Sequence, residues 1–427
     1  MRTHGDAARF VRAASGARSG WGPVVTGVVA RRARVTVPVV LDYLLSHLGF
    51  FAVLPVLPVL LERFEPAGGA VFVGVALFAF NFAVRGASLF VSSLLHRADV
   101  RVAMAFGLLM AAAGFAVLPV APGAAGIVAA LLLAGTGIST NGLMARVYVA
   151  LSLETVARNT VFSTVQIAVN VSAALGPVVA NLMLDNALDT LLLLAVAGMY
   201  VLAAAAVLVL VPGGVRPDDG DVRPPLRWGL LRAVVADPHV RRVSLITAAG
   251  GFLYAQFFSA VALQVAQVTD DPAWRAGIFT ANAVLVVALQ VPVTAYCARR
   301  LGAGTPPTVF LLVGVGIFAA AFALMGITGA VVAGVLGAVA VFSLAETFFT
   351  PMVNTAFSVI PGDRPVVELF NLRQVAATAG ESVGAFTGGA LFLTAAAHGA
   401  RPLYWGALAV FGVLAVLFHL FTPAQEG

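Results

Sequence analysis

The chain has 427 residues, of which 60% are hydrophobic and only 10% are charged, and its mean hydropathy is +0.99. A soluble protein of this size does not enclose so much apolar surface in a core, so the composition excludes a soluble globular domain and indicates a protein embedded in lipid. The net charge is +6 and all 25 basic residues are arginine. We attribute this usage to a GC-rich genome, so the basic pI does not indicate a nucleic-acid partner.

Long apolar runs recur along the chain, at the length of about 20 residues that a helix needs to cross a bilayer. No stretch shows the alternation that is typical of an outer-membrane barrel strand. The sequence therefore predicts an all-α polytopic membrane protein. Its twelve transmembrane helices are expected at residues 35–61, 70–95, 102–121, 125–151, 160–184, 190–212, 243–268, 276–298, 308–327, 329–358, 367–396 and 403–422.

The arginines fall mainly on one side of this predicted topology. With both termini in the cytoplasm, 19 of the 25 arginines are cytoplasmic, three lie in outer loops and three lie within spans. This is the bias that the positive-inside rule requires, and adding or removing one span would scramble it. We expect a multi-pass protein of the inner (cell) membrane, with an uncleaved and disordered N-terminal arm.

The second half of the chain repeats the first. The segment FSTVQIAVNVSAALGPVV from Phe162 aligns without a gap with FNLRQVAATAGESVGAFT from Phe370, at an offset of 208 residues. A direct repeat of six spans relates two halves by an axis along the membrane normal, as in many secondary transporters. The expected domains are a cytoplasmic N-terminal arm (1–34), an N-terminal six-helix half (35–212), a cytoplasmic linker (213–242), a C-terminal six-helix half (243–422) and a cytoplasmic tail (423–427).

Polar side chains within the predicted spans follow a period of three helices. They occur in eight helices, whereas the third, sixth, ninth and twelfth carry essentially none. Because polar groups inside a membrane need a wet or protein-lined interior, we expect the eight helices to surround a cavity between the halves. The predicted substrate cavity includes Asp42, Arg85, Asn141, Asn170, Tyr254, Gln256, Asn282, Glu346 and Asn354. For Tyr254, Gln256 and Asn282 the alternative is ordinary hydrogen bonding between helices.

Three carboxylates within the spans are the candidate proton-coupling residues. An intramembrane carboxylate costs at least about 2.5 kcal/mol on insertion, which favours a functional role. Asp42 and Glu346 are the leading candidates and Glu381 is the third. A structural alternative pairs Asp42 with Arg85, which lies at a similar depth. Glu381, in turn, is alternatively a hydrogen-bonding group at a close helix contact.

Two prolines interrupt the outer third of the first span. Pro55 and Pro58 each remove a backbone hydrogen bond and bend a helix. We expect either a kink that lets the outer end of the helix move, as alternating access requires, or simply the end of the helix.

The motif LGFFAVLPVLP from Leu48 follows the pattern L-G-x5-P-V-x-P, and GPVV at Gly176 and Pro177 is similar to G-x-x-x-G-P-x-x-G-G. On these residues the chain resembles the drug:proton antiporter branch of the major facilitator superfamily. The resemblance implies the major facilitator fold, with two six-helix halves, and transport by alternating access. We expect the glycines and the proline of these motifs to serve helix packing and bending, and the eleventh span repeats the glycine spacing at Gly380, Gly384 and Gly388.

The loop between the second and third spans departs from this family. The family pattern G-x-L-x-D-R-x-G-R-R reads SSLLHRADVR here, so that His96 replaces the aspartate, while Arg97 and Arg101 remain. Asp99 offers a carboxylate nearby, and we expect Arg97, Asp99 and Arg101 to be conformational residues. The arginine that the family carries early in the fourth span is absent, and Arg146 lies further along it.

The sequence holds no nucleotide-binding loop and no zincin or serine-hydrolase motif, so we expect no enzymatic activity, cofactor or metal site. We interpret the chain as a monomeric secondary transporter that couples protons to the efflux of small amphipathic or hydrophobic compounds. One alternative is a proton symporter for a nutrient or metabolite. Another is a transport-inactive membrane receptor or scaffold that uses the basic linker as its contact surface. Only the motifs of the first and fifth spans favour export.

Overall fold

The computed structural model describes residues 22–95, 98–153, 155–217, 232, 234–361 and 366–421, and the regular elements of these residues are helices. The first half contains α2 (Gly22–Val53), α3 (Leu57–Phe64), α4 (Gly69–Leu95), α5 (Val100–Val117), α6 (Gly123–Ser152), α7 (Thr155–Asp185) and α8 (Asp189–Leu210). The second half contains α10 (Pro238–Ala255), the π-helical η3 (Phe257–Val261), α11 (Ala262–Val268), α12 (Pro272–Gly302), α13 (Pro307–Thr328), α14 (Val332–Ser358), α15 (Val366–Ala397) and α16 (Arg401–Phe421).

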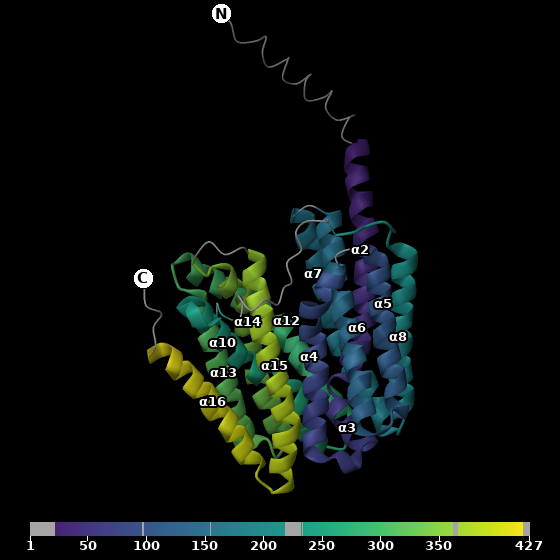
Figure 1. The fold of residues 1–427 in the computed structure, drawn as a ribbon. Helices are drawn as coiled ribbons and strands as arrows, with labels where there is room; N and C mark the ends of the chain where they lie inside the picture. The colour runs from purple at the N-terminus through teal and green to yellow at the C-terminus, as the bar shows by residue number, and fades with distance from the viewer. Residues whose placement is uncertain are drawn as a thin grey trace, which may run out of the picture.

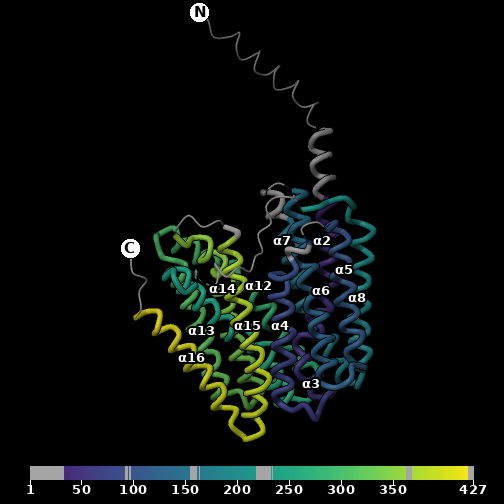
Figure 2. Tube along the Cα trace, in the orientation of Figure 1, coloured from purple at the N-terminus to yellow at the C-terminus, as the bar shows by residue number. Residues whose placement is uncertain are grey.

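Each half is a helix bundle with an apolar core of its own, and the two bundles lie side by side (Figure 1, Figure 2). In the first bundle the buried rings of Phe115 and Tyr200 stack with their centroids 5.6 Å apart. In the second, Phe322 packs between Phe342 and Trp405, at centroid distances of 6.1 and 5.7 Å. Separate cores let each bundle keep its shape while the contact between them changes.

Eleven helices of the described residues are long and apolar enough to cross a membrane. The predicted eleventh span, α15, is not among them, although it has 32 residues. It carries Arg373 and Glu381 between small polar residues and glycines, which lowers its hydropathy. Its position explains this composition, because α15 packs between α4 of one half and α10 of the other. The chain is an all-α polytopic membrane protein, and α15 lies at the junction of its two halves.

The first span is broken at its prolines. α2 ends at Val53, residues 54–56 form a turn, and α3 then begins at Leu57 with Pro58 in its first turn. Pro55 has no N–H to continue the hydrogen-bond ladder of α2, whereas Pro58 is tolerated at a helix N-terminus. The helix thus resumes after Pro55, with Pro58 in its first turn, and continues to Phe64. Their role in movement stays a prediction.

The seventh span is deformed at the equivalent depth. Between α10 and α11 the backbone forms the π-helical segment η3, from Phe257 to Val261. The repeat offset of 208 residues maps the break at 54–56 to 262–264, directly after this segment. α3 and α11 contact one another beyond the two deformations. Both helices therefore depart from regular geometry where the halves meet, and such departures are common at hinges.

Glycines bring backbones into contact next to both deformations. A Cβ on Gly176 of α7 would lie 2.7 Å from the backbone of α2, and one on Gly384 of α15 would lie 2.4 Å from the backbone of α10. These two glycines are equivalent in the repeat. Gly380 and Gly388 lie one turn before and after Gly384, and they contact α10 and η3 in the same way. Glycine is required wherever helices approach this closely.

Gly384→Ala is expected to lower the free energy of unfolding by about 1–3 kcal/mol, because the added methyl group overpacks the contact between α15 and α10. The measurement is the melting temperature of the purified protein in detergent. Gly277→Ala in α12 is the matched control, because a Cβ there meets no atom within 4 Å. Equal melting temperatures for the two variants would show that this contact does not depend on glycine.

Candidate functional site

Asp42 on α2 is held by an amide of the same half. Nδ2 of Asn141 on α6 donates to Oδ1 and Oδ2 of Asp42, at 3.1 and 3.2 Å. The carboxylate is fully enclosed, with 0% of the residue exposed. No arginine among the described residues lies within 4.0 Å of Asp42. The structure therefore brings two predicted cavity residues together, but both are buried and do not line the cavity.

Glu346 on α14 occupies a similar setting in the second half. Nδ2 of Asn282 on α12 donates to its Oε2 at 3.2 Å and to Oγ of Ser343 at 3.0 Å. The hydroxyl of Tyr254 on α10 donates to Oε1 at 3.5 Å. Unlike Asp42, Glu346 is only half-buried. Three predicted cavity residues from three helices thus meet at one carboxylate.

Each half therefore contains a carboxylate whose side-chain partners, among the described residues, are neutral. Asp42 and Asn141 form one such pair, and Glu346 and Asn282 form the other. Breaking a buried ion pair is costly because it leaves an unpaired charge. Protonation of Asp42 or Glu346 leaves no cation unpaired, and an amide remains a hydrogen-bonding partner for the neutral acid. This arrangement suits groups that take up and release protons.

The third predicted coupling residue, Glu381 on α15, has a different partner. Its Oε2 lies 2.8 Å from Nε of Arg85 on α4, in an ion pair that crosses from one half to the other. The side chain of Glu381 is 13% exposed and that of Arg85 is 43% exposed. Nε2 of Gln374 also donates to the carbonyl of Arg85. The alternative in which Arg85 pairs with Asp42 is wrong, because Arg85 binds the opposite half.

His47 is a polar residue of this region that the predicted lining omits. It lies on α2 one turn beyond Tyr43, and the two rings stack with centroids 4.9 Å apart. His47 also interacts electrostatically with Arg85 and Arg146. The sequence carries two signals for His47. It lies four residues after Tyr43, and residues four apart share a helix face. It also lies close to Asp42, a polar residue of the same span. Arg146 likewise faces the region between the halves.

Two other predicted cavity residues lie elsewhere. Gln256 is fully buried, and its Nε2 donates to the Gly384 carbonyl at 3.1 Å and to Thr387 Oγ1 at 3.2 Å. The Tyr404 hydroxyl donates to its Oε1 at 2.6 Å. Gln256 therefore joins α10 to α15 and α16, as in the alternative of hydrogen bonding between helices. Asn354 is exposed near the end of α14.

Asp99, the last residue before α5, is held within the first half. Asp99 caps α5 by accepting a hydrogen bond from Arg101 N at 2.9 Å, and it also accepts one from Gly214 N. Val100 N donates to the Val215 carbonyl at 2.9 Å. The start of α5 is thus attached to the segment that follows α8. Arg97 and His96 lie outside the described residues.

The two halves touch at the end of the molecule where α3 lies, hereafter the α3 side. There NH2 of Arg275 on α12 lies 3.6 Å from Oδ1 of Asp185 on α7, and Thr280 Oγ1 donates to the Ala174 carbonyl at 2.9 Å. The rings of Phe51 on α2 and Phe258 on η3 also meet, at a centroid distance of 6.4 Å. The α3 side is therefore closed.

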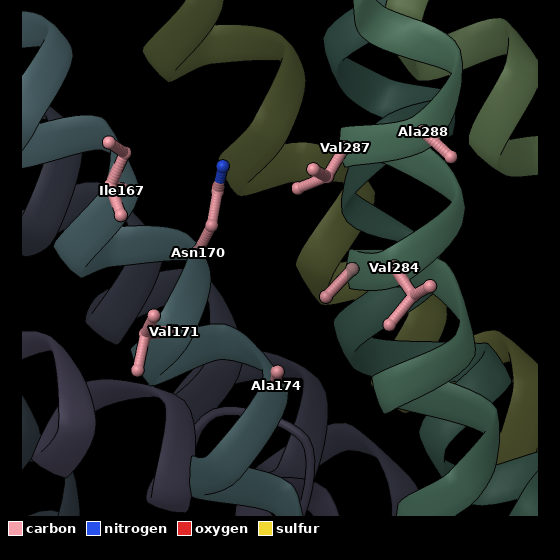
Figure 3. Close-up of a pocket in the computed structure, with 8 residues that line it drawn as sticks. Ile167, Asn170, Val171, Ala174, Val284, Val287 and Ala288 are labelled. Atoms are coloured by element: carbon pink, nitrogen blue, oxygen red, sulfur yellow. The ribbon is translucent and has the colours of Figure 1, made fainter.

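The opposite end of the molecule, where the chain runs from α8 to α10, is hereafter the linker side. Toward it, α7 and α12 leave a cleft of about 450 Å³ between them (Figure 3). Its lining consists of Ile167, Asn170, Val171, Ala174, Ala283, Val284, Val287 and Ala288. Asn170 is the single polar member and extends from α7 toward α12 (Figure 3). The volume falls within the range of ligand pockets, about 300–1,000 Å³.

Comparison with known proteins identifies the family. The family described as Major Facilitator Superfamily matches residues 39–367. Two curated relatives named Multidrug resistance protein MdtH, from Aeromonas hydrophila subsp. hydrophila and Aeromonas salmonicida (strain A449), are each 27% identical, over 390 and 389 residues. Each alignment covers 88% of this chain and 92% of the relative.

Solved structures share the fold. A POT family transporter in complex with a thioalcohol conjugated peptide superposes with a TM-score of 0.73 at 11% identity, over 90% of this chain and 95% of that one. A bacterial homolog of the human lysosomal transporter Spinster, inward-facing and unoccupied, gives 0.65 at 16% identity, over 91% and 96%. With the family matched over most of its length and the fold shared, this chain belongs to the major facilitator superfamily and is a multi-pass membrane transporter, not an enzyme.

Proposed function

We propose that this transporter couples the entry of protons to the export of small amphipathic or hydrophobic compounds across the inner membrane. The observation that carries the proposal is the pair of carboxylates, Asp42 and Glu346, one in each half and each held by an asparagine amide. The name of the curated relatives, multidrug resistance protein, supports the class of compound. The motif at Pro55 and Pro58 supports the direction.

Coupling follows from where the two carboxylates lie. Glu346 is half-buried, so it can meet either a proton or a cationic group of the substrate. Asp42 is enclosed, so no group of the substrate reaches it in this conformation. A ligand shifts a conformational equilibrium by its difference in affinity for the two states, so protons and substrate that compete at Glu346 drive opposite transitions.

The orientation follows from the arginines. With 19 of the 25 arginines on the linker side, we assign that side and both termini to the cytoplasm. The conformation is then closed toward the periplasm and open toward the cytoplasm, as the cleft between α7 and α12 indicates. We propose that residues 35–212 and 243–422 move as two units about the α3 side, in a monomer.

The apolar cleft supports substrates with an apolar part. Ala288→Trp and Val171→Trp are expected to lower kcat/KM for a lipophilic dye by about 10-fold, because filling a hydrophobic pocket by a few carbon atoms costs about 1–3 kcal/mol. The measurement is dye efflux from energised cells or liposomes. Val209→Trp on α8 is the matched control, since Val209 is 81% exposed and does not line the cleft. A loss as large in the control would rule out a role for the cleft.

The test of the proposed function is proton movement out of acidified inverted vesicles that contain the protein. Lipophilic drugs and common nutrients are added in turn, and the internal pH is followed with a fluorescent indicator. We expect drugs to trigger alkalinisation of the lumen, as protons leave in exchange. Alkalinisation by nutrients alone, or by nothing in the panel, would contradict a drug exporter.

A second candidate is proton symport of a nutrient or metabolite. Arg146 and Arg373, which have no carboxylate within 4.0 Å among the described residues, favour a substrate with a negative group, as many metabolites have. The same vesicles separate the two functions, because a symporter moves substrate and protons in one direction. Substrate added outside then acidifies the lumen of vesicles that begin at equal pH, whereas an exporter makes it alkaline.

A further inference from the structure

Three guanidinium groups gather where the two halves face one another. They belong to Arg85 on α4, Arg146 on α6 and Arg373 on α15. Arg373 interacts electrostatically with both Arg85 and Arg146. Arginine stays charged inside proteins, so this group cannot relieve its mutual repulsion by losing a proton. Negative charge placed beside these arginines lowers their mutual repulsion.

Among the described residues, one carboxylate serves this group of three arginines. Glu381 binds Arg85 at 2.8 Å and also attracts Arg373 from a longer distance, which leaves two positive charges in excess. Arg373 reaches the neutral Oε1 of Gln374, at 3.4 Å, and its Nε is buried without a hydrogen-bond partner in the described part of the chain. Arg146 is exposed and lies against the hydroxyl of Tyr43. Within the described ranges, no carboxylate lies within 4.0 Å of Arg146 or Arg373.

The positive-inside bias alone does not account for these two residues. An arginine that serves only topology extends its head group toward water or lipid phosphates. Arg373 instead turns toward Arg85 and Arg146 and buries its Nε. The two guanidinium groups without a carboxylate within 4.0 Å, here called the anion site, therefore have donors available for a negative group between the halves. Guanidinium groups suit carboxylate and phosphate, which they bind through paired hydrogen bonds.

A negative group of the protein lies across from this anion site. Glu346 has no arginine within 4.0 Å among the described residues. Tyr254 donates to Glu346 and interacts electrostatically with Arg85 and Glu381, so the carboxylate adjoins the same space as the arginines. Arg146 lies apart from the buried pair of Asp42 and Asn141. It is five residues after Asn141 on α6, about 7–8 Å nearer the linker side at 1.5 Å per residue.

We propose that the transported compound is a zwitterionic amphiphile, whose negative group binds between Arg146 and Arg373 and whose positive group binds at Glu346. The inference rests on the proposed function and names its substrate class. The expected effect of protonation on substrate affinity agrees with exchange. A proton on Glu346 removes the negative partner of the substrate's positive group, while the arginines keep their charge. Proton uptake therefore weakens substrate binding, as an antiporter requires.

The experiment compares two dyes that differ in one charge: a zwitterionic rhodamine with a free carboxylate, and its methyl ester, which is a cation. Affinity is measured by fluorescence anisotropy on the purified full-length protein. We expect wild type to bind the zwitterion more tightly. Arg146→Gln and Arg373→Gln should each weaken zwitterion binding by about 10-fold, the value of a hydrogen bond to a charged group, and leave the ester unchanged. Lysine at either position should restore part of the affinity.

Arg300→Gln is the matched control, because it removes the same charge at the linker end of α12, away from the three arginines. Unchanged ester binding shows that each variant is folded. Equal losses for both dyes, or a preference of wild type for the ester, would overturn the inference. So would a loss that appears only with anionic lipid present and is equal for both dyes, because the anion would then be a lipid phosphate. Proton exchange in vesicles tests the proposed function separately.

Discussion

Asp42→Asn is expected to abolish proton-driven accumulation while leaving the downhill exchange of substrate intact. Asparagine has nearly the volume of aspartate, and its carbonyl oxygen can still accept from Asn141 Nδ2. It cannot bind a proton, so the conformational change is no longer linked to the pH gradient. A gradient of one pH unit supplies about 1.4 kcal/mol per proton, or tenfold accumulation for each coupled proton. The variant should therefore equilibrate its substrate and reach no gradient.

The measurement is the steady-state dye gradient across liposomes with an imposed pH difference, together with exchange of labelled substrate at equal pH. Glu346→Gln should also lose the pH-driven gradient, but its downhill exchange should slow as well, because we place Glu346 at the positive group of the substrate. Asp270→Asn is the control, since it makes the same chemical change in the loop before α12. Retention of a pH-driven gradient by Asp42→Asn would exclude this carboxylate from coupling.

Hydropathy and the repeat predict most of the fold from the sequence. The predicted spans correspond to helices of the structure, with the first and seventh interrupted and α15 less apolar than the others, and the equivalence of Gly176 and Gly384 places both at backbone contacts. These features depend on local composition and spacing, which a single sequence displays. The N-terminal arm is the exception, because α2 begins at Gly22 and not near residue 35. α2 continues through Pro38 and beyond the apolar run, and hydropathy registers only the apolar part of such a helix.

Side-chain partners are harder to predict because they depend on helix rotation and on which helices are neighbours. Depth along the span suggests Asp42 for Arg85, yet Arg85 points across the junction to Glu381. Likewise, the polarity of Gln256 indicates a need for partners but not whether water or a neighbouring helix provides them. Its carbonyl and amide are all used by α10, α15 and α16. Composition identifies which residues need partners, and packing decides which partners they have.

Breaking the ion pair between Arg85 and Glu381 is expected to shift the balance between inward-open and outward-open states. The pair joins α4 to α15 in this conformation. An exposed pair contributes about 1 kcal/mol or less, and removing one partner of a buried pair costs about 3–5 kcal/mol. With Arg85 43% exposed, we place this pair near the lower value, at about 1–2 kcal/mol. That is about a 5- to 30-fold change in the equilibrium between the two states.

The measurement uses one cysteine pair as a reporter of the linker-side opening, in a background without Cys297, the single native cysteine. Ile167→Cys and Val287→Cys face the cleft from α7 and α12, and a bifunctional crosslinker reports whether the cleft is open. Glu381→Gln should lower the inward-open fraction, and the exchange Arg85→Glu with Glu381→Arg should restore it. A double-mutant cycle with zero coupling would show that the pair is a surface contact. If the cycle shows a substantial coupling energy but the variants transport at the wild-type rate, the pair contributes to stability only. A substantial coupling energy together with slower substrate exchange would confirm the prediction.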